Sequence, residues 1–188
     1  MKNLVSIHDL LAIIEHTEGW LSPHEQVALL HLPSMVDHLN GDIVEIGSYK
    51  GKSTIALALG SSLMSKKKRP IYAIDPFLDY YPSFQFNINY HRLQDFIIPI
   101  RQFSTQAYDD CPKSIAALFI DGDHEYSSVK HDITHYVSRV VNGGLILFHD
   151  YTEQFPGVIK AVNELCNNSE YNIVLTYDHL IIVRKTNN

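Results

Sequence analysis

Short apolar runs recur along this chain, and most of them end at a polar or acidic residue. Five such runs predict buried strands at 42–46, 70–74, 97–101, 116–120 and 143–148. The segments between them carry apolar residues at helical spacing, so strands and helices alternate. This alternation predicts an α/β fold in which helices cover both faces of a mostly parallel sheet.

Two further helices are expected before the first strand. Residues 7–16 have apolar positions at helical spacing, and a second helix begins after Ser22, which with Glu25 has the signature of a capping box. Pro33 is expected to kink this second helix or to separate residues 34–39 from it.

Trp20 and Leu21 lie between these two helices. The favoured interpretation is that they hold the helices together, because a Trp side chain has a large apolar area to bury. The alternative is that they line the mouth of a substrate site. Residues 1–40 are expected to form a helical cap on a core of residues 41–188, within a single domain of residues 1–188.

The last third of the chain predicts a helix at 157–166 and two strands at 172–177 and 180–185. Only Asp178 and His179 separate these two strands, so they are expected to form an antiparallel hairpin at the end of the sheet.

The first predicted strand runs into a turn with two glycines, Gly47 and Gly51, and then into a helical pattern over 53–63. Such a turn lets a ligand approach the backbone and aims helix N–H groups at it. The spacing is one residue short of a P-loop and does not match the dinucleotide fingerprint. Glu45 at the strand end would repel a phosphate and favours a cationic or hydroxyl-bearing ligand. A tight turn without a ligand is the alternative.

Four acidic residues fall at strand ends: Glu45, Asp75, Asp121 and Asp150. The carboxyl ends of parallel strands lie at one edge of a sheet, where ligands bind. Gathering this much negative charge is costly unless a cation, a metal or a hydrogen-bonding ligand offsets it. Asp75 is at the position where nucleotide-binding α/β folds hold ribose hydroxyls, so it is the predicted ribose ligand. Its alternative role is to cap a turn or a helix.

Two motifs near these strand ends are more specific. I-D-G-D-H-x-Y-x-x-V begins at Ile120, and G-G-x-I-x-F-H-D-Y begins at Gly143. With E-x-G-x-x-x-G after the first strand, they resemble the family-24 type of class I S-adenosylmethionine (SAM) dependent methyltransferases, over roughly residues 20–151. The relatives of that family include small-molecule and antibiotic-sugar O-methyltransferases. The resemblance implies a Rossmann-like, seven-stranded sheet with a C-terminal antiparallel hairpin.

The resemblance also implies how SAM would be held. The glycines would leave room for its methionine part, Asp75 would meet the ribose, and Ser104 would lie near the adenine. The full set of implied cofactor-binding residues is Glu45, Gly47, Ser48, Gly51, Ser53, Asp75, Ser104 and Asp121.

In metal-dependent relatives, acids at the fourth and fifth strand ends hold a divalent cation such as Mg²⁺ that activates the attacking oxygen. Asp121, His149 and Asp150 are the corresponding residues, although His149 stands where an acid is common and imidazole suits softer ions than magnesium. Alternatively His124 or His149 is the general base, since histidine titrates near neutral pH. A role of His124 as a helix cap is equally open.

Seven aromatic residues lie between Phe77 and Phe96. A packed helix is expected to account for most of them, while residues 79–83 are a candidate lid over a substrate. This segment is compatible with a sugar, with a phenol or with an internal core.

Composition narrows the class of protein. Charged residues at 19% and apolar residues at 45% are typical of a globular protein, and a net charge of −6 argues against a general nucleic-acid binder. Cys111 and Cys166 have neither metal-ligand spacing nor the density of a disulfide scaffold. The N-terminus becomes polar too early for a signal peptide, and no apolar run could span a bilayer. A cytoplasmic protein without membrane or nucleic-acid partners is expected, with homo-oligomerisation left open.

The expected activity is transfer of a methyl group from SAM to an oxygen of a small acceptor, such as a sugar or a phenol, with or without a divalent metal. Asp121, His124 and His149 are the expected catalytic residues. One rival is an NAD- or nucleotide-sugar-binding α/β enzyme, which the glycine spacing disfavours. The other rival is a non-catalytic relic that binds SAM without turnover.

Overall fold

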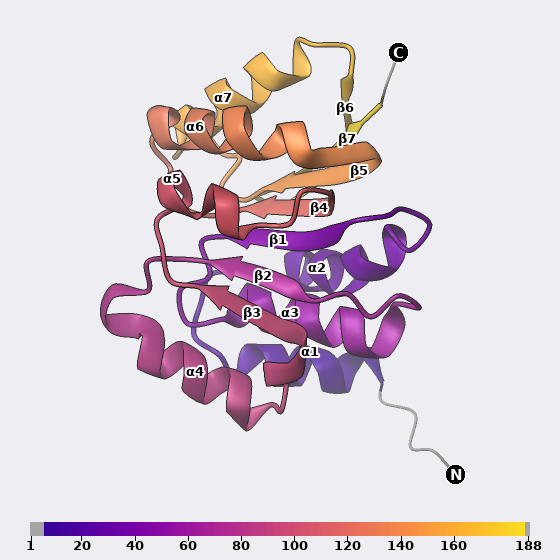
Figure 1. The fold of residues 1–188 in the computed structure, drawn as a ribbon, viewed down its shortest axis with the longest axis vertical. Coiled ribbons are helices and arrows are strands. Elements are labelled where there is room, and N and C mark those ends of the chain that lie inside the picture. The colour runs from indigo at the N-terminus through magenta and orange to yellow at the C-terminus, as the bar shows by residue number, and fades with distance from the viewer. Residues whose placement is uncertain (1–5, 187–188) are drawn as a thin grey trace.

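The computed structural model describes residues 6–186, and its centre is a seven-stranded sheet with helices on both faces (Figure 1). The strand order is β3-β2-β1-β4-β5-β7-β6; β1 to β5 pair in parallel, and β7 runs antiparallel to both β5 and β6. The predicted Rossmann-like fold with a C-terminal hairpin is confirmed. The strands are β1 (Asp42–Ile46), β2 (Ile71–Ile74), β3 (Ile97–Ile100), β4 (Ile115–Ile120), β5 (Val140–Phe148), β6 (Tyr171–Tyr177) and β7 (Leu180–Lys185).

Alternation along each strand divides the core into two layers, one on each face of the sheet. In β1, for example, Ile43 belongs to one apolar cluster, and Val44 and Ile46 belong to the other. The first layer packs against α1 (Ile7–Glu15), α2 (Pro23–Met35), α3 (Lys52–Leu59) and α4 (Tyr81–Tyr90). The second packs against α5 (Ser104–Ala107), α6 (Tyr126–Tyr136) and α7 (Pro156–Cys166).

The N-terminal helices begin as predicted. The Ser22 hydroxyl accepts the N–H of Glu25, and the Glu25 carboxylate accepts the N–H of Ser22, which completes the capping box of α2. The helix continues through Pro33 and ends at Met35, so residues 34–39 do not form the separate helix that was one alternative. Of the predicted domain, residues 1–5 and 187–188 lie outside the described residues.

The fifth strand begins earlier than predicted. Helix α6 ends at Tyr136, and β5 begins at Val140, so both Gly143 and Gly144 lie inside the strand. A Cβ atom at Gly144 would lie 2.6 Å from Cγ1 of Val140 and 3.0 Å from the carbonyl oxygen of Ala116. The glycines therefore mark a close approach within the sheet, where the register with β4 shifts, and not the boundary of the strand.

The aromatic segment is divided between the core and the surface. Phe77 and Phe84 are fully buried and pack at a centroid distance of 4.5 Å. Tyr81 and Phe96 are partly buried against the same core, whereas Tyr80, Phe86 and Tyr90 are exposed. Four of the seven aromatics therefore pack against the core, two of them, Tyr81 and Phe84, from α4. Of the candidate lid, residues 79–80 end a short 3₁₀ turn and residues 81–83 form the first turn of α4, and none of them lines the pocket described below.

No helix within the described residues 6–186 is both long and apolar enough to span a lipid bilayer.

Candidate active site

The residues that follow the parallel strands lie side by side at the carboxyl edge of the sheet. Hydrogen bonding of the sheet continues one residue beyond the strand ends: the N–H of Asp121 donates to the carbonyl of Ile46 at 2.8 Å, and the N–H of His149 donates to the carbonyl of Ile120 at 3.0 Å. The backbone hydrogen bonds alone therefore place Asp121 and His149 next to each other, independently of any contact between their side chains.

A pocket of about 1340 Å³ opens above this edge. Its walls come from the linker between α1 and α2, the glycine turn, the ends of β2, β4 and β5, the starts of α5 and α6, and the turn between β6 and β7. Asp75, Asp121 and Asp150 line the pocket, whereas Glu45 does not. Three of the four predicted acidic strand ends therefore meet in one crevice.

The carboxylate of Asp75 holds the glycine turn. Its Oδ2 accepts the N–H groups of Ser48 and Tyr49 at 2.9 and 2.8 Å, and its Oδ1 accepts the N–H of Phe77. Asp75 thus caps the turn, which was the alternative to a role as ribose ligand. The two roles are compatible, because each carboxylate oxygen has more than one lone pair and Asp75 also lines the pocket.

The two glycines of the turn are required by the fold itself. Gly47 has a φ of +91°, and a Cβ atom there would lie 1.9 Å from the carbonyl oxygen of Asp121. Gly51 has a φ of +93° and is the N-cap of α3. Gly47 lines the pocket and Gly51 does not, so space for a cofactor is an additional requirement at Gly47 only.

Glu45 lies behind the turn, fully buried on the α3 side of the sheet. Its Oε2 accepts the hydroxyls of Ser48 at 2.7 Å and Thr54 at 2.5 Å. Burial raises the pKa of Glu45 to about 7, although the neighbouring hydroxyls, including that of Ser53, act in the opposite direction. Glu45 supports the turn from behind, so the direct cofactor contact expected from the resemblance does not match this placement.

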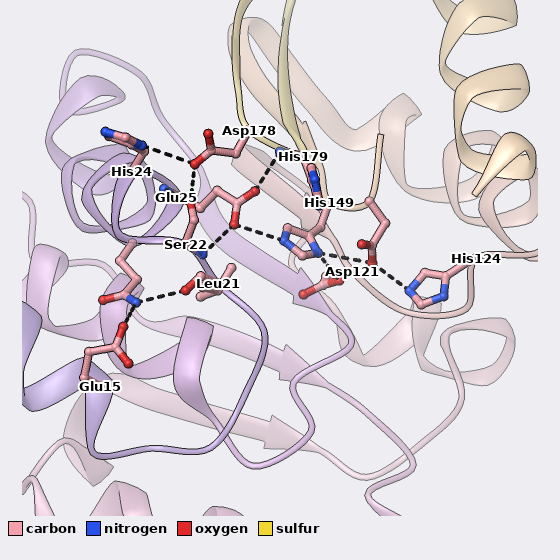
Figure 2. A network of polar contacts seen from close by, with 12 residues as sticks. Glu15, Leu21, Ser22, His24, Glu25, Asp121, His124, His149, Asp178 and His179 are labelled. Atoms are coloured by element: carbon pink, nitrogen blue, oxygen red, sulfur yellow. Dashed lines mark hydrogen bonds and ion pairs between the residues drawn. The ribbon is translucent and has the colours of Figure 1, made fainter. Parts of the chain in front are cut away.

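His149 is the centre of a buried ionic cluster (Figure 2). Its Nδ1 lies 3.1 Å from Oδ1 of Asp121 and 3.2 Å from Oδ2 of Asp150, and its Nε2 lies 3.4 Å from Oε2 of Glu25. Burial alone would lower the pKa of His149, but hydrogen bonds to the three carboxylates raise it to about 12. The three carboxylates thus favour the protonated form of the His149 ring.

This arrangement bears on the two roles predicted for His149. An imidazolium has no free lone pair, so the protonated ring cannot act as a general base or as a metal ligand. The general base and the metal ligand therefore stay predictions, which the neutral form of His149 would require. The third carboxylate was not expected, because Glu25 is 124 residues away from His149 along the chain. The sequence identifies Glu25 only as part of a capping box, a role that does not predict a buried partner.

Glu25 also joins the start of α2 to the C-terminal hairpin at the wall of the pocket. Its Oε1 accepts the N–H of His179, in the turn between β6 and β7, at 2.9 Å. Beside it, the Ser22 hydroxyl donates to the carboxylate of Asp178, as Figure 2 shows. The start of α2 and the C-terminal hairpin are thereby fixed to each other and to His149.

His124 is partly exposed and faces the pocket. Its side chain is 41% exposed and lines the pocket, its Nε2 lies 2.8 Å from Oδ2 of Asp150, and its ring packs against Phe155. The alternative role of His124 as a helix cap is not observed, because Asp123 accepts the N–H of Glu125 and the hydroxyl of Ser128 at the start of α6.

Asp150 adopts a left-handed backbone conformation with a φ of +58°. Such a conformation is uncommon for a residue other than glycine and persists only where the surroundings enforce it. Here it places one carboxylate oxygen between the rings of His124 and His149.

Asp121, His124 and Asp150 could together hold a divalent cation, because one donor atom from each lies within 4.8 Å of the others. His124 thus replaces His149 in the predicted metal set. Two carboxylates and one imidazole fit a divalent ion in donor type and suit zinc or manganese better than magnesium. Asp121 and Asp150 also pair with the His149 imidazolium, which would compete with such an ion for them.

The remaining predicted cofactor residues, Ser48, Ser53 and Ser104, all line the pocket. Trp20 does as well: it is 75% exposed, and its ring lies 5.4 Å from that of Tyr49. The interpretation that Trp20 holds the two N-terminal helices together is therefore wrong, and the alternative of a place at the mouth of the site holds. Leu21 is partly buried against the core.

A comparison with known families identifies the chain. Residues 44–151, more than half of the chain, match a family model described as a methyltransferase domain, of family 24. The matched stretch contains the glycine turn and both later motifs. The chain belongs to the class I SAM-dependent methyltransferases.

One individual protein with a similar sequence is a distant relative of this methyltransferase. An uncharacterized protein of Acanthamoeba polyphaga mimivirus is 32% identical over 136 residues, which cover 65% of this chain and 58% of the relative. The chain thus spans less than two thirds of that relative's length.

Solved structures with the same fold include an O-methyltransferase from Bacillus cereus in complex with S-adenosylhomocysteine (SAH), with a TM-score of 0.73 and 16% identity over 95% of this chain and 90% of that one. The O-methyltransferase TomG from Streptomyces achromogenes, in complex with SAM, has a TM-score of 0.72 and 14% identity over 89% of this chain and 82% of that one.

The pocket residues that the sequence did not identify include three buried charged ones: Glu25, Lys52 and Asp132. Lys52 and Asp132 lie on helices whose spacing indicates which faces are apolar but not which polar residue faces a ligand. The sequence signal that could have identified Lys52 and Asp132 is a charged residue on a helix face that is otherwise apolar. Such a residue is rarely buried unless it is paired.

Proposed function

We propose that this methyltransferase transfers the methyl group of SAM to a hydroxyl oxygen of a small acceptor, such as a sugar or a phenol. The observation that carries the proposal is that one pocket joins two sets of residues. The glycine turn and Asp75 provide a place for the cofactor, and His124 and Asp150 provide a means of removing a proton from the acceptor. Bringing both substrates into one pocket supplies proximity, a large part of the rate of a methyl transfer.

The proton step follows from the pairing of His124. Oδ2 of Asp150 lies 2.8 Å from Nε2 of His124 and favours a proton on that nitrogen, which leaves Nδ1 with the lone pair that can take a proton from the acceptor hydroxyl. The carboxylate of Asp150 then stabilises the imidazolium that forms. His149 keeps Asp121 and Asp150 in place, while the excess of carboxylates around it leaves the site negative, which suits the sulfonium of SAM.

A metal would supply different chemistry at the same residues. If a divalent ion is bound by Asp121, His124 and Asp150, it lowers the pKa of the acceptor hydroxyl directly. Methyl transfer measured with and without EDTA separates the two possibilities. Activity that survives the chelator assigns the proton to His124, and activity that is lost with EDTA and restored by zinc or manganese assigns the metal.

Cofactor binding is tested by calorimetry with SAH and NAD. SAH is expected to bind more tightly, and Asp75→Ala is expected to weaken it by about fivefold or more, because the carboxylate both orders the turn and faces the pocket. Asp95→Ala, which alters an exposed aspartate outside the pocket, is the control. Tighter binding of NAD would refute the proposal, and unchanged affinity for SAH would remove Asp75 from the site.

Turnover is tested with methyl-labelled SAM and a panel of sugars and phenols. Label transfer to at least one hydroxyl is expected. Binding of SAH without transfer to any member of a broad panel would favour a protein that binds SAM without catalysis.

A further inference from the structure

The only tryptophan of the chain is exposed inside the pocket. Trp20 lies in the linker between α1 and α2 and is 75% exposed, more than any other large apolar side chain among residues 6–186. An indole ring has a large apolar area, and burying that area releases free energy that is forgone while the ring stays in water. An exposed ring of this size in a pocket indicates a ligand that covers it.

Neighbouring side chains hold the ring of Trp20 in place from one side. Its centroid lies 5.4 Å from that of Tyr49, and Tyr80 packs its edge against Tyr49 at 4.5 Å. The hydroxyl of Tyr49 donates to the carboxylate of Glu18 at 3.0 Å, and Lys50 pairs with the same carboxylate at 2.6 Å. Trp20 therefore rests on a fixed partner while most of its own ring stays open. A ring that is positioned in advance loses little conformational entropy when a ligand stacks on it.

The linker that carries Trp20 runs away from the place expected for the adenine. Trp20 packs beside the turn after β1, and two residues later Ser22 contacts the turn between β6 and β7. In the strand order, β4, β5 and β7 lie on this side of β1, and His124 and Asp150 follow β4 and β5. Ser104, where the adenine is expected, follows β3 on the other side of β1. The adenine is the only flat ring system of SAM, so the face of Trp20 is left to the acceptor.

The polar side chains beside Trp20 are already engaged with other protein groups. Each carboxylate oxygen of Glu18 accepts a hydrogen bond from the support described above. The hydroxyl of Ser22 donates to Asp178, and the intervening Leu21 has an apolar side chain. A sugar requires hydrogen bonds for several hydroxyls, whereas a flat aromatic ring requires an apolar face. This wall of the pocket suits a phenol better than a sugar.

We propose that Trp20 is the platform on which the ring of the acceptor stacks, and that the acceptor is a phenol and not a sugar. This inference rests on the proposed function, because it assumes that the pocket binds SAM and that the acceptor hydroxyl meets His124. It makes Trp20 a specificity-determining residue that neither holds the cofactor nor moves the proton.

The fluorescence of Trp20 reports on this contact directly, because the chain has no other tryptophan. Quenching by acrylamide is measured for the free protein, with saturating SAH, and with SAH plus catechol, 4-methylphenol, glucose or rhamnose. SAH alone and the two sugars are expected to leave the quenching constant unchanged. At least one of the two phenols is expected to lower it by about threefold or more, because a stacked ring covers the exposed face.

Two variants of Trp20 separate a flat face from apolar volume. Calorimetry measures the affinity of the SAH-bound protein for the phenol that shields Trp20 most. Trp20→Leu is expected to weaken this affinity by about 10-fold or more, whereas Trp20→Phe, which keeps a flat ring, should stay within about threefold of the wild type. Phe86→Leu, at an exposed phenylalanine outside the pocket, is the matched control and should bind the phenol as the wild type does. Affinity for SAH itself is expected to be unchanged in all three variants, which also shows that each is folded.

The outcomes separate this inference from the proposed function. If SAH binds and shields Trp20 by itself, the ring belongs to the cofactor site, and the inference is overturned while the proposed function stands. Shielding by a sugar, or by none of the four probes, would likewise overturn it. So would a Trp20→Leu variant that binds the phenol as tightly as Trp20→Phe does. A wild-type protein that does not bind SAH would instead overturn the proposed function.

Discussion

The turn after β1 and the ends of β4 and β5 both bury acidic side chains, but they stabilise them differently. Glu45 is surrounded by hydroxyls alone, and burial raises its pKa to about 7. Asp121 and Asp150 share the imidazolium of His149 and face the pocket. Burial raises the pKa of Asp121 as well, against the hydrogen bond of His149, whereas the pKa of Asp150 is lowered by His149 and His124 despite its burial. A cation beside a buried carboxylate thus opposes the loss of charge that burial favours, and in this pair it prevails at Asp150.

The largest effect is expected from removing the shared cation. His149→Gln should lower the free energy of unfolding at pH 7 by roughly 3–5 kcal/mol, because it leaves buried carboxylates without their partner. Urea unfolding measures the change, and His8→Gln, at an exposed histidine, is the control. A loss below about 1 kcal/mol would show that the cluster is not ionic in the folded chain.

The pH dependence of stability tests the same cluster. The pKa of His149 is raised from 6.5 to about 12, so its stabilisation is complete below pH 6.5 and is lost as the pH rises toward 12. Between pH 7.5 and 10, the free energy of unfolding of the wild type should fall relative to that of His149→Gln by up to about 1.4 kcal/mol per pH unit. Parallel profiles for the two proteins would contradict the assignment.

Asp121→Asn should affect catalysis more than folding. The amide oxygen can still accept from His149, but the negative charge facing the pocket is lost, so kcat is expected to fall by about 100-fold or more while the unfolding midpoint changes little. The measurement uses any acceptor that supports turnover, with Asp109→Asn, at an exposed site outside the pocket, as the matched variant. Full activity of Asp121→Asn would remove Asp121 from the reaction.

Glu45→Gln is expected to have the smallest effect on the cofactor. Because Glu45 lies behind the turn and not in the pocket, SAH affinity should stay within about twofold of wild type. The pH dependence of stability sharpens the contrast. Because the pKa of Glu45 is raised, the free energy of unfolding of the wild type falls as the pH rises from 4.5 through 7. The free energy of unfolding of Glu45→Gln should therefore rise relative to that of the wild type over this range. A tenfold loss of affinity would instead place Glu45 in contact with the cofactor.

Much of the fold was predictable because its signals are local. The capping box of Ser22 and Glu25, the glycine turn, the βαβ alternation and the C-terminal hairpin depend on residues close together in the sequence. The predictions that were wrong involve contacts across the chain. Gly143 was taken for a strand boundary although it lies inside β5, and Trp20 was taken for a core residue although it lines the pocket.

The sequence by itself determined the order of strands and helices, and therefore that Asp75, Asp121 and Asp150 follow strands that end at the same edge. The tertiary structure decided which side chains surround those residues. The charge of His149 depends on Glu25 from α2, 124 residues away along the chain. Apolar periodicity records which side of an element is buried, but the charge and reactivity of a side chain are set by neighbours that only folding brings within a few ångströms.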